Sequence, residues 1–181
     1  IDQAEQSIQT AKKCIDYSKA LDNQIIRTFL GNKPSDALTS KEENTLIQSL
    51  KEVLLTAEKN EIYFGIETHN DQPSDRAEYI LKLLKECNSK YLKVLFDGFN
   101  FYADHRDMMP EYELLKAHTI HYHIKNYLWN ERISLPLDQG DVDFTVLIKQ
   151  IKNDHVFVSF EYFAPNIGEL VKKSLDWINK L

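Results

Sequence analysis

Four polar side chains that can bind a metal ion end short apolar runs of the sequence: Glu67, Asp97, His123 and Glu161. They are separated by 30, 26 and 38 residues, and each interval is about the length of one strand and one helix. If the runs are parallel strands of a barrel, the four side chains converge at the carboxyl-terminal rim, where the active sites of such barrels lie. Three carboxylates and one imidazole would suit Mn²⁺, Mg²⁺ or Co²⁺, and zinc is an alternative.

Taken singly, each of these residues also has a structural explanation. An acid after a strand commonly caps a helix or faces solvent, and a lone histidine is as readily part of the core as a ligand. Four such residues in phase favour a metal site, because a carboxylate beside an apolar strand costs free energy unless it is paired or metal-bound.

The elements that must position these residues alternate between apolar runs and segments of helical period. The runs predict five strands, at residues 24–30, 62–68, 92–97, 119–125 and 156–162. The periodic segments predict six helices, at residues 2–21, 39–57, 74–86, 110–117, 141–152 and 165–181. Thr39 and Glu42 have the types and spacing of a capping box, which supports a helix start at that point.

Alternating helices and strands predict an α/β fold, with a parallel sheet and helices outside it. A doubly wound fold normally begins with a strand, whereas this chain begins with a helix. Five strands and six helices match the last five strands of a (β/α)₈ TIM barrel. The sequence therefore predicts one domain over residues 1–181, a partial barrel incomplete at its N-terminus, with segments 24–30 and 156–162 as open edges.

The composition excludes several classes of protein. The chain has 181 residues, 43% of them hydrophobic, and a net charge of −6, which argues against a protein that binds nucleic acid through phosphate contacts. The apolar runs are far shorter than the ~20 residues of a membrane span. Cys14 and Cys87 are too few for a disulfide framework and no signal peptide opens the chain, so we expect a cytoplasmic protein. Because the first residue is Ile1, we expect the natural start to lie elsewhere.

The motifs around the four polar residues resemble those of the sugar phosphate isomerase/epimerase family, the xylose isomerase-like barrels. The resemblance rests on the order and spacing of I-E-x-H at Glu67, D-x-x-N at Asp97, H-x-K at His123, the segment 140–144 and the closing Glu161. It implies a (β/α)₈ barrel of roughly 250–280 residues, of which this chain is the C-terminal portion. It also implies that Glu67, Asp97, His123 and Glu161 bind the metal, and that the two glutamates form the acid/base pair.

The activity that the resemblance implies is isomerisation or epimerisation of a sugar or sugar phosphate through an enediolate. The metal would hold the substrate oxygens, and one glutamate would remove a proton that the other returns. We expect further substrate contacts from Arg27, His69, Asn100 and Lys125, with His121 and Trp129 as weaker candidates. Asn100 and Asn126 depart from the family pattern, in which histidine and aspartate are common at these positions.

Other functions remain open at this point. A keto-inositol dehydratase-type lyase would use nearly the same metal ligands. An apurinic endonuclease-like phosphodiesterase shares the barrel, but the acidic charge and only six histidines argue against it. A degenerate barrel without turnover is the alternative that is not an enzyme. The expected partner is a small-molecule substrate, without nucleic acid or membrane, and a homo-oligomer is compatible with the sequence.

Overall fold

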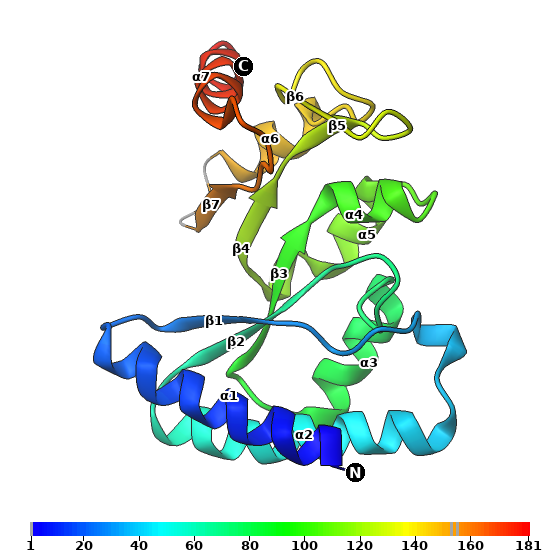
Figure 1. The fold of residues 1–181 in the computed structure, drawn as a ribbon, viewed down its shortest axis with the longest axis vertical. Helices are drawn as coiled ribbons and strands as arrows, with labels where there is room; N and C mark the ends of the chain where they lie inside the picture. Colours follow the sequence, from blue (N-terminus) through cyan, green and yellow to red (C-terminus); the bar gives the residue numbers. More distant parts are fainter. Residues whose placement is uncertain (1, 153, 155) are drawn as a thin grey trace.

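A single sheet of five parallel strands is the centre of the structure, a computed structural model that describes residues 2–152, 154 and 156–181. The strands lie in the order β1-β2-β3-β4-β7 and fan out along the long axis of the molecule (Figure 1). Their bounds are Ile25–Thr28, Tyr63–Glu67, Leu92–Asp97, Thr119–Ile124 and Phe157–Phe160. This is the predicted partial TIM barrel of five parallel strands, with the strands in sequential order.

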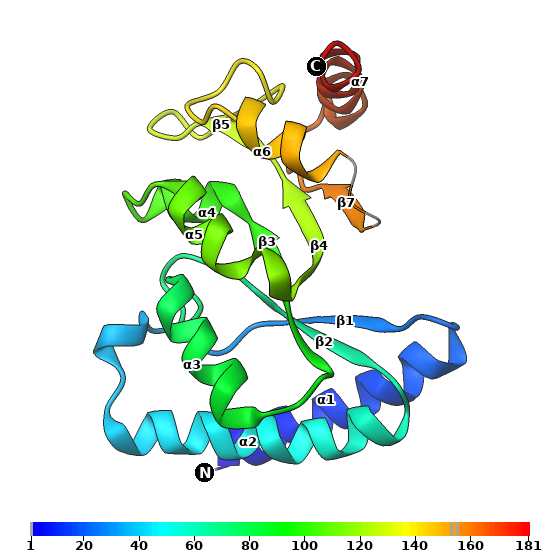
Figure 2. The same cartoon turned by 180° about the vertical axis from the view of Figure 1, so that it is seen from behind.

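Seven α-helices among the described residues connect and cover these strands: α1 Asp2–Ala20, α2 Ser40–Lys59, α3 Ala77–Cys87, α4 Gly98–Ala103, α5 Met108–Leu115, α6 Thr145–Ile151 and α7 Ile167–Ile178. Two 3₁₀ turns, η1 Ser35–Ala37 and η2 Lys116–His118, lie in the connections. The view from behind shows α3 and α5 beside the central strands, with α1 and α2 side by side at one end (Figure 2).

Alternate side chains of each strand point to opposite faces of the sheet. One face packs against the helices and is almost fully buried, and its residues are Phe64, Ile66, Val94, Phe96, Tyr122 and Ile124. The other face carries the polar side chains of the predicted site. The apolar face thus fixes the register, because a shift of one residue would turn the polar set into the core.

The predicted helix start at Thr39 is confirmed. Its side chain accepts a hydrogen bond from the Glu42 N–H, and the Glu42 side chain accepts one from the Thr39 N–H. The helix then buries an apolar stripe, which consists of Ile47, Leu50, Val53, Leu54 and Ala57. Leu46, next to Ile47, is only partly buried.

One helix and one hairpin were not predicted. Helix α4 follows Asp97 directly, and the Asp97 side chain caps it by accepting the Phe99 N–H at 3.0 Å. Strands β5 Asn126–Leu128 and β6 Ile133–Leu135 form an antiparallel hairpin with Trp129 at the start of its turn, where only a loop was expected. Their three-residue strands are too short to produce a recognisable alternating pattern.

The two ends of the sheet are β1 and β7, as predicted. The side chain of Phe157 in β7 is 73% exposed, and Phe29, just after β1, is also exposed. Both edge strands are shorter than predicted. An edge strand has a neighbouring strand on one side only, so its side chains have fewer residues to pack against than those of the inner strands.

A buried asparagine holds the chain that returns from the hairpin. Asn126, in place of the family's common aspartate, donates its side-chain N–H groups to the carbonyls of Leu137 and Val142, both at 2.7 Å. Its side-chain oxygen accepts the N–H groups of Tyr127 and Val142. An aspartate could not make the two donations. Gly140 packs directly on this amide, with no room for a β-carbon.

We predict that Gly140→Ala destabilises the fold. The new β-carbon would lie 2.8 Å from the Tyr127 nitrogen and overlap the Asn126 amide, so this hydrogen-bonded loop must shift. The expected loss in free energy of unfolding is about 1–3 kcal/mol, measured by denaturant titration. Gly168→Ala in α7 is the matched control, because its β-carbon meets nothing within 4 Å. Equal stability of the two variants would contradict the role given to Gly140.

Candidate metal centre

Glu67, Asp97, His123 and Glu161 lie together at one end of the sheet. Each offers one ligand atom, and these atoms all lie within 4.8 Å of one another. Glu67 and Asp97 are the last residues of β2 and β3, and Asp97 is paired in register with His123 on β4. Glu161 directly follows β7, and its N–H donates to the Ile124 carbonyl. The parallel register therefore brings residues that are far apart in sequence to the same rim.

Two cations bridge the carboxylates of this cluster. Arg27 Nη1 lies 2.8 Å from Glu67 Oε2 and 3.2 Å from Glu161 Oε1. Lys125 Nζ lies 2.7 Å from Asp97 Oδ2 and 2.6 Å from Glu161 Oε2. His123 Nδ1 is 2.9 Å from Glu67 Oε1. Three carboxylates are thus packed with two permanent positive charges and one imidazole.

Burial raises the pKa values of the acids Asp97 and Glu67, whereas nearby positive groups lower them. Asp97 is fully buried, and this raises its pKa to about 6; Lys125 opposes the rise, whereas Glu161 and Glu67 add to it. Burial also tends to raise the pKa of Glu67, but the hydrogen bond with His123 and the charge of Arg27 outweigh it, so that pKa is lowered. Burial tends to lower the pKa of Lys125, yet Asp97 and Glu161 hold it above its usual range.

The donor set fits a divalent ion. Bonds of about 2.0–2.6 Å place ligand atoms on opposite sides of an ion at most about 5 Å apart, and the four ligand atoms meet this limit. Asp97 Oδ2 is buried without a partner in hydrogen-bond geometry, although Lys125 Nζ is near enough to form an ion pair. That oxygen therefore keeps lone pairs that a metal could use. Carboxylates with one imidazole suit Mn²⁺, Mg²⁺ or Co²⁺, with zinc as an alternative.

The structure places the other predicted substrate residues differently. Arg27 and Lys125 lie in the cluster itself. His69 lies outside it, with its ring edge-on to Phe29, whose face carries the Arg27 guanidinium. The Asn100 side chain is buried and donates to the Thr68 carbonyl at 2.9 Å. The substrate role of these residues stays a prediction.

The two weaker candidates, His121 and Trp129, are both partly buried. His121 lies on the same face of β4 as His123, with its Nε2 2.8 Å from Ser159 Oγ, and burial lowers its pKa. Trp129 packs on Phe99 and carries the guanidinium of Arg132 on its ring. Sequence reasoning missed Thr68, a fully buried residue between the first two ligand strands. Its position directly after Glu67 was the only available signal.

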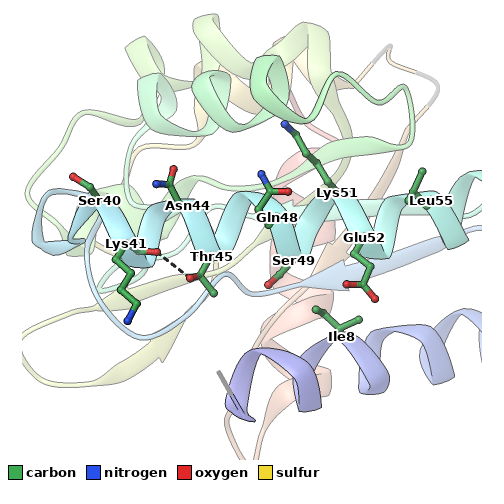
Figure 3. Close-up of a pocket in the computed structure, with 10 residues that line it drawn as sticks. All are labelled: Ile8, Ser40, Lys41, Asn44, Thr45, Gln48, Ser49, Lys51, Glu52 and Leu55. Atoms are coloured by element: carbon green, nitrogen blue, oxygen red, sulfur yellow. Dashed lines mark hydrogen bonds between the residues drawn. The ribbon is translucent and has the colours of Figure 1, made fainter.

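A separate groove of about 770 Å³ lies between α1 and α2. Figure 3 shows that it is lined mainly by polar side chains of α2, with Ile8 of α1 opposite them. None of the residues of the candidate metal centre contributes to it. Among the described residues, the group of side chains that could hold a metal ion therefore lies at the sheet rim and not in this groove.

Comparison with known proteins identifies the family. The model of the xylose isomerase-like TIM barrel family matches residues 1–181. The chain belongs to this family. A curated relative, the 3-dehydroshikimate dehydratase of Bacillus anthracis, is 25% identical over 167 residues, covering 83% of this chain and 60% of the relative. The chain therefore spans less than two thirds of the length of that protein.

Solved structures of this family share the fold. A probable 3-DHS dehydratase from Bacillus anthracis has a TM-score of 0.87 and 21% identity, over 97% of this chain and 70% of the other. A D-tagatose 3-epimerase-like protein has a TM-score of 0.75 and 20% identity, over 97% and 71%. A Mycobacterium smegmatis family member in complex with magnesium has a TM-score of 0.74 and 16% identity, over 99% and 68%. Among the described residues, no helix combines the length and apolar character needed to cross a bilayer.

We predict that Mn²⁺ raises the melting temperature of the protein and that Asp97→Asn removes this effect. An ion that binds only the folded state adds about 2.7 kcal/mol at a concentration 100 times its Kd. Asp16→Asn, an exposed position in α1, is the control and should keep the full shift. The affinity should fall as the pH drops through about 6, because Asp97 must lose its proton to bind the ion. Calorimetric titrations at two pH values measure the Kd for Mn²⁺. An Asp97→Asn variant that binds Mn²⁺ with the same Kd as the unsubstituted protein would contradict the site.

We predict that Arg27→Met destabilises the metal-free protein, because the buried Glu67 carboxylate loses its closest permanent cation. Arg27 is 42% exposed, so a modest loss of about 1–3 kcal/mol is expected. Saturating Mn²⁺ should reduce this loss, since the ion supplies the missing positive charge. Lys12→Met, which removes the exposed Lys12–Glu52 pair, should cost less than about 1 kcal/mol with or without Mn²⁺. A loss from Arg27→Met that is unchanged by Mn²⁺ would argue against this electrostatic account.

Proposed function

We propose that the chain carries the metal site of an enzyme that moves a proton next to a carbonyl group, as a sugar or sugar-phosphate isomerase or epimerase. The observation that carries the proposal is the shared ligand cluster, in which two glutamates, an aspartate and a histidine lie within 4.8 Å. Two glutamates at one site supply both a proton acceptor and a proton donor. Membership of the xylose isomerase-like family supports the same class of reaction.

A bound divalent ion would act as a Lewis acid on the substrate oxygens and favour loss of the neighbouring proton. Glu67 and Glu161 are the proposed acid/base pair. Arg27 contacts both of them and would keep their carboxylates in place, with the pKa of Glu67 below its usual value. Lys125 is buried between Asp97 and Glu161, and its ammonium could donate a hydrogen bond to a substrate oxygen.

Dehydration is the second candidate, favoured by the 25% identity to a 3-dehydroshikimate dehydratase. It begins with the same step, loss of a proton next to a carbonyl, and then expels a hydroxyl group as water while a C=C bond forms. His69 would suit the base of such a reaction. Its Nδ1 lies 2.6 Å from the Asn70 carbonyl, which can only accept, so this contact favours the neutral tautomer in which Nδ1 donates and Nε2 can accept a proton.

The two candidates predict different products from the full natural protein loaded with Mn²⁺. An epimerase working in D₂O transfers deuterium to the carbon that loses its proton when a ketose such as D-tagatose or D-allulose is offered, which NMR detects. A dehydratase converts 3-dehydroshikimate into a conjugated product whose ultraviolet absorption grows with time. We expect deuterium incorporation. A rise in absorbance without deuterium incorporation would instead support the dehydratase as the function of this protein. If neither deuterium incorporation nor a rise in absorbance is seen, both candidate reactions are contradicted.

We predict that Glu67→Gln and Glu161→Gln each lower kcat by about 10²–10⁴-fold at saturating Mn²⁺, since general acid/base groups are typically worth this much. The fold should persist, because glutamine has nearly the same size and can still accept from Arg27. Glu86→Gln, an exposed position in α3, is the control and should retain full turnover. Near-normal kcat in either site variant would remove that glutamate from the acid/base pair.

A further inference from the structure

Thr68 connects the ends of the two strands that carry the first two ligands. It directly follows Glu67 and is fully buried. Its hydroxyl accepts the Asp97 N–H at 2.8 Å and donates to the Asp97 carbonyl at 3.0 Å. The last registered pair of β2 and β3 is Glu67 with Leu95. The Thr68 side chain therefore continues the pairing of the strands as far as Asp97.

Asn100 completes a closed loop of hydrogen bonds around the same point. Its side-chain N–H donates to the Thr68 carbonyl at 2.9 Å. Asn100 lies in α4, and the Asp97 carboxylate caps that helix through Oδ1, which accepts the Phe99 N–H. One carboxylate oxygen of Asp97 is thus fixed by backbone, and the other, Oδ2, lies beside Lys125 in the cluster.

These contacts link the two ligands through backbone rather than through their carboxylates. The backbone of Asp97 is held by Thr68, the residue next to Glu67, so the backbone positions of the two ligands are restrained relative to each other. Ordering ligands before the ion arrives reduces the free-energy cost of binding it, and outer partners of metal ligands typically affect affinity ~10–100-fold.

We infer that Thr68 and Asn100 are positioning residues that fix Glu67 relative to Asp97 before a divalent ion binds. The inference rests on the metal site proposed above. Both side chains contact backbone: the Thr68 hydroxyl contacts the N–H and carbonyl of Asp97, and the Asn100 side-chain N–H donates to the Thr68 carbonyl.

The test compares Thr68→Val with Thr68→Ser and with a control elsewhere on the sheet. Thr119→Val is the control, since Thr119 is also buried and its hydroxyl also donates to a backbone carbonyl, that of Leu115, at the start of β4. We expect both valine variants to lower the melting temperature of the metal-free protein. Thr68→Val should weaken the Kd for Mn²⁺, measured by calorimetry, by about 10-fold or more. Thr68→Ser should restore it, and Thr119→Val should leave it unchanged.

Asn100→Leu keeps the size of the side chain but removes its donor, and it serves if Thr68→Val fails to fold. It should weaken Mn²⁺ binding by a smaller factor than Thr68→Val. Mn²⁺ affinity equal to that of the original protein in a folded Thr68→Val or Asn100→Leu variant would overturn the positioning role while leaving the metal site intact. Equal weakening by Thr119→Val would also overturn it. An original protein that does not bind Mn²⁺ would overturn the metal site, and the inference with it.

Discussion

The grouping of three carboxylates at one end of a parallel sheet, two of them fully buried, is the constraint on which the arrangement of the site depends. Glu67 and Asp97 are fully buried, and an unpaired buried charge costs several kcal/mol (order of magnitude). Arg27 and Lys125 offset this cost, each by contacting two carboxylates at once. In the same arrangement the pKa of Asp97 is raised to about 6, because the positive charge of Lys125 does not fully offset the effect of burial on this carboxyl group. A divalent ion in this cluster would therefore meet ligands already gathered around positive charge.

Bringing the ligands together requires the correct register of four strands of the sheet. Each ligand lies at the carboxyl end of a different strand, so the positions of the four side chains depend on the register of β2, β3, β4 and β7 together. That register is set on the opposite face, where Phe96, Tyr122 and Ile124 pack against the helices. Core packing thus depends on one face of these strands and ligand geometry on the other. A shift of the register by one residue would change both.

Much of this arrangement could be predicted from sequence because it is periodic. Strand β3 was predicted with its observed bounds, and the sheet order followed from the alternation of strands and helices. The clustering of Glu67, Asp97, His123 and Glu161 followed from their equal phase at strand ends. Helix α4 could not be predicted in this way, because it begins on the Asp97 cap and lasts only six residues. Thr68 was missed for a similar reason: its role is a contact with the next strand, which a local pattern does not encode.

The elements without a periodic signal are those that hold the ends of the strands. Thr68 continues the pairing of β2 with β3 through its hydroxyl, and Asn126 holds the chain that returns from the β5–β6 hairpin through four hydrogen bonds. Each lies immediately after a residue of the site, Glu67 and Lys125 respectively. Strands give the approximate position of a side chain, because their backbone bonds stop where the strand stops. Beyond that point, buried hydrogen bonds of the Thr68 and Asn126 side chains hold the backbone beside the residues of the site.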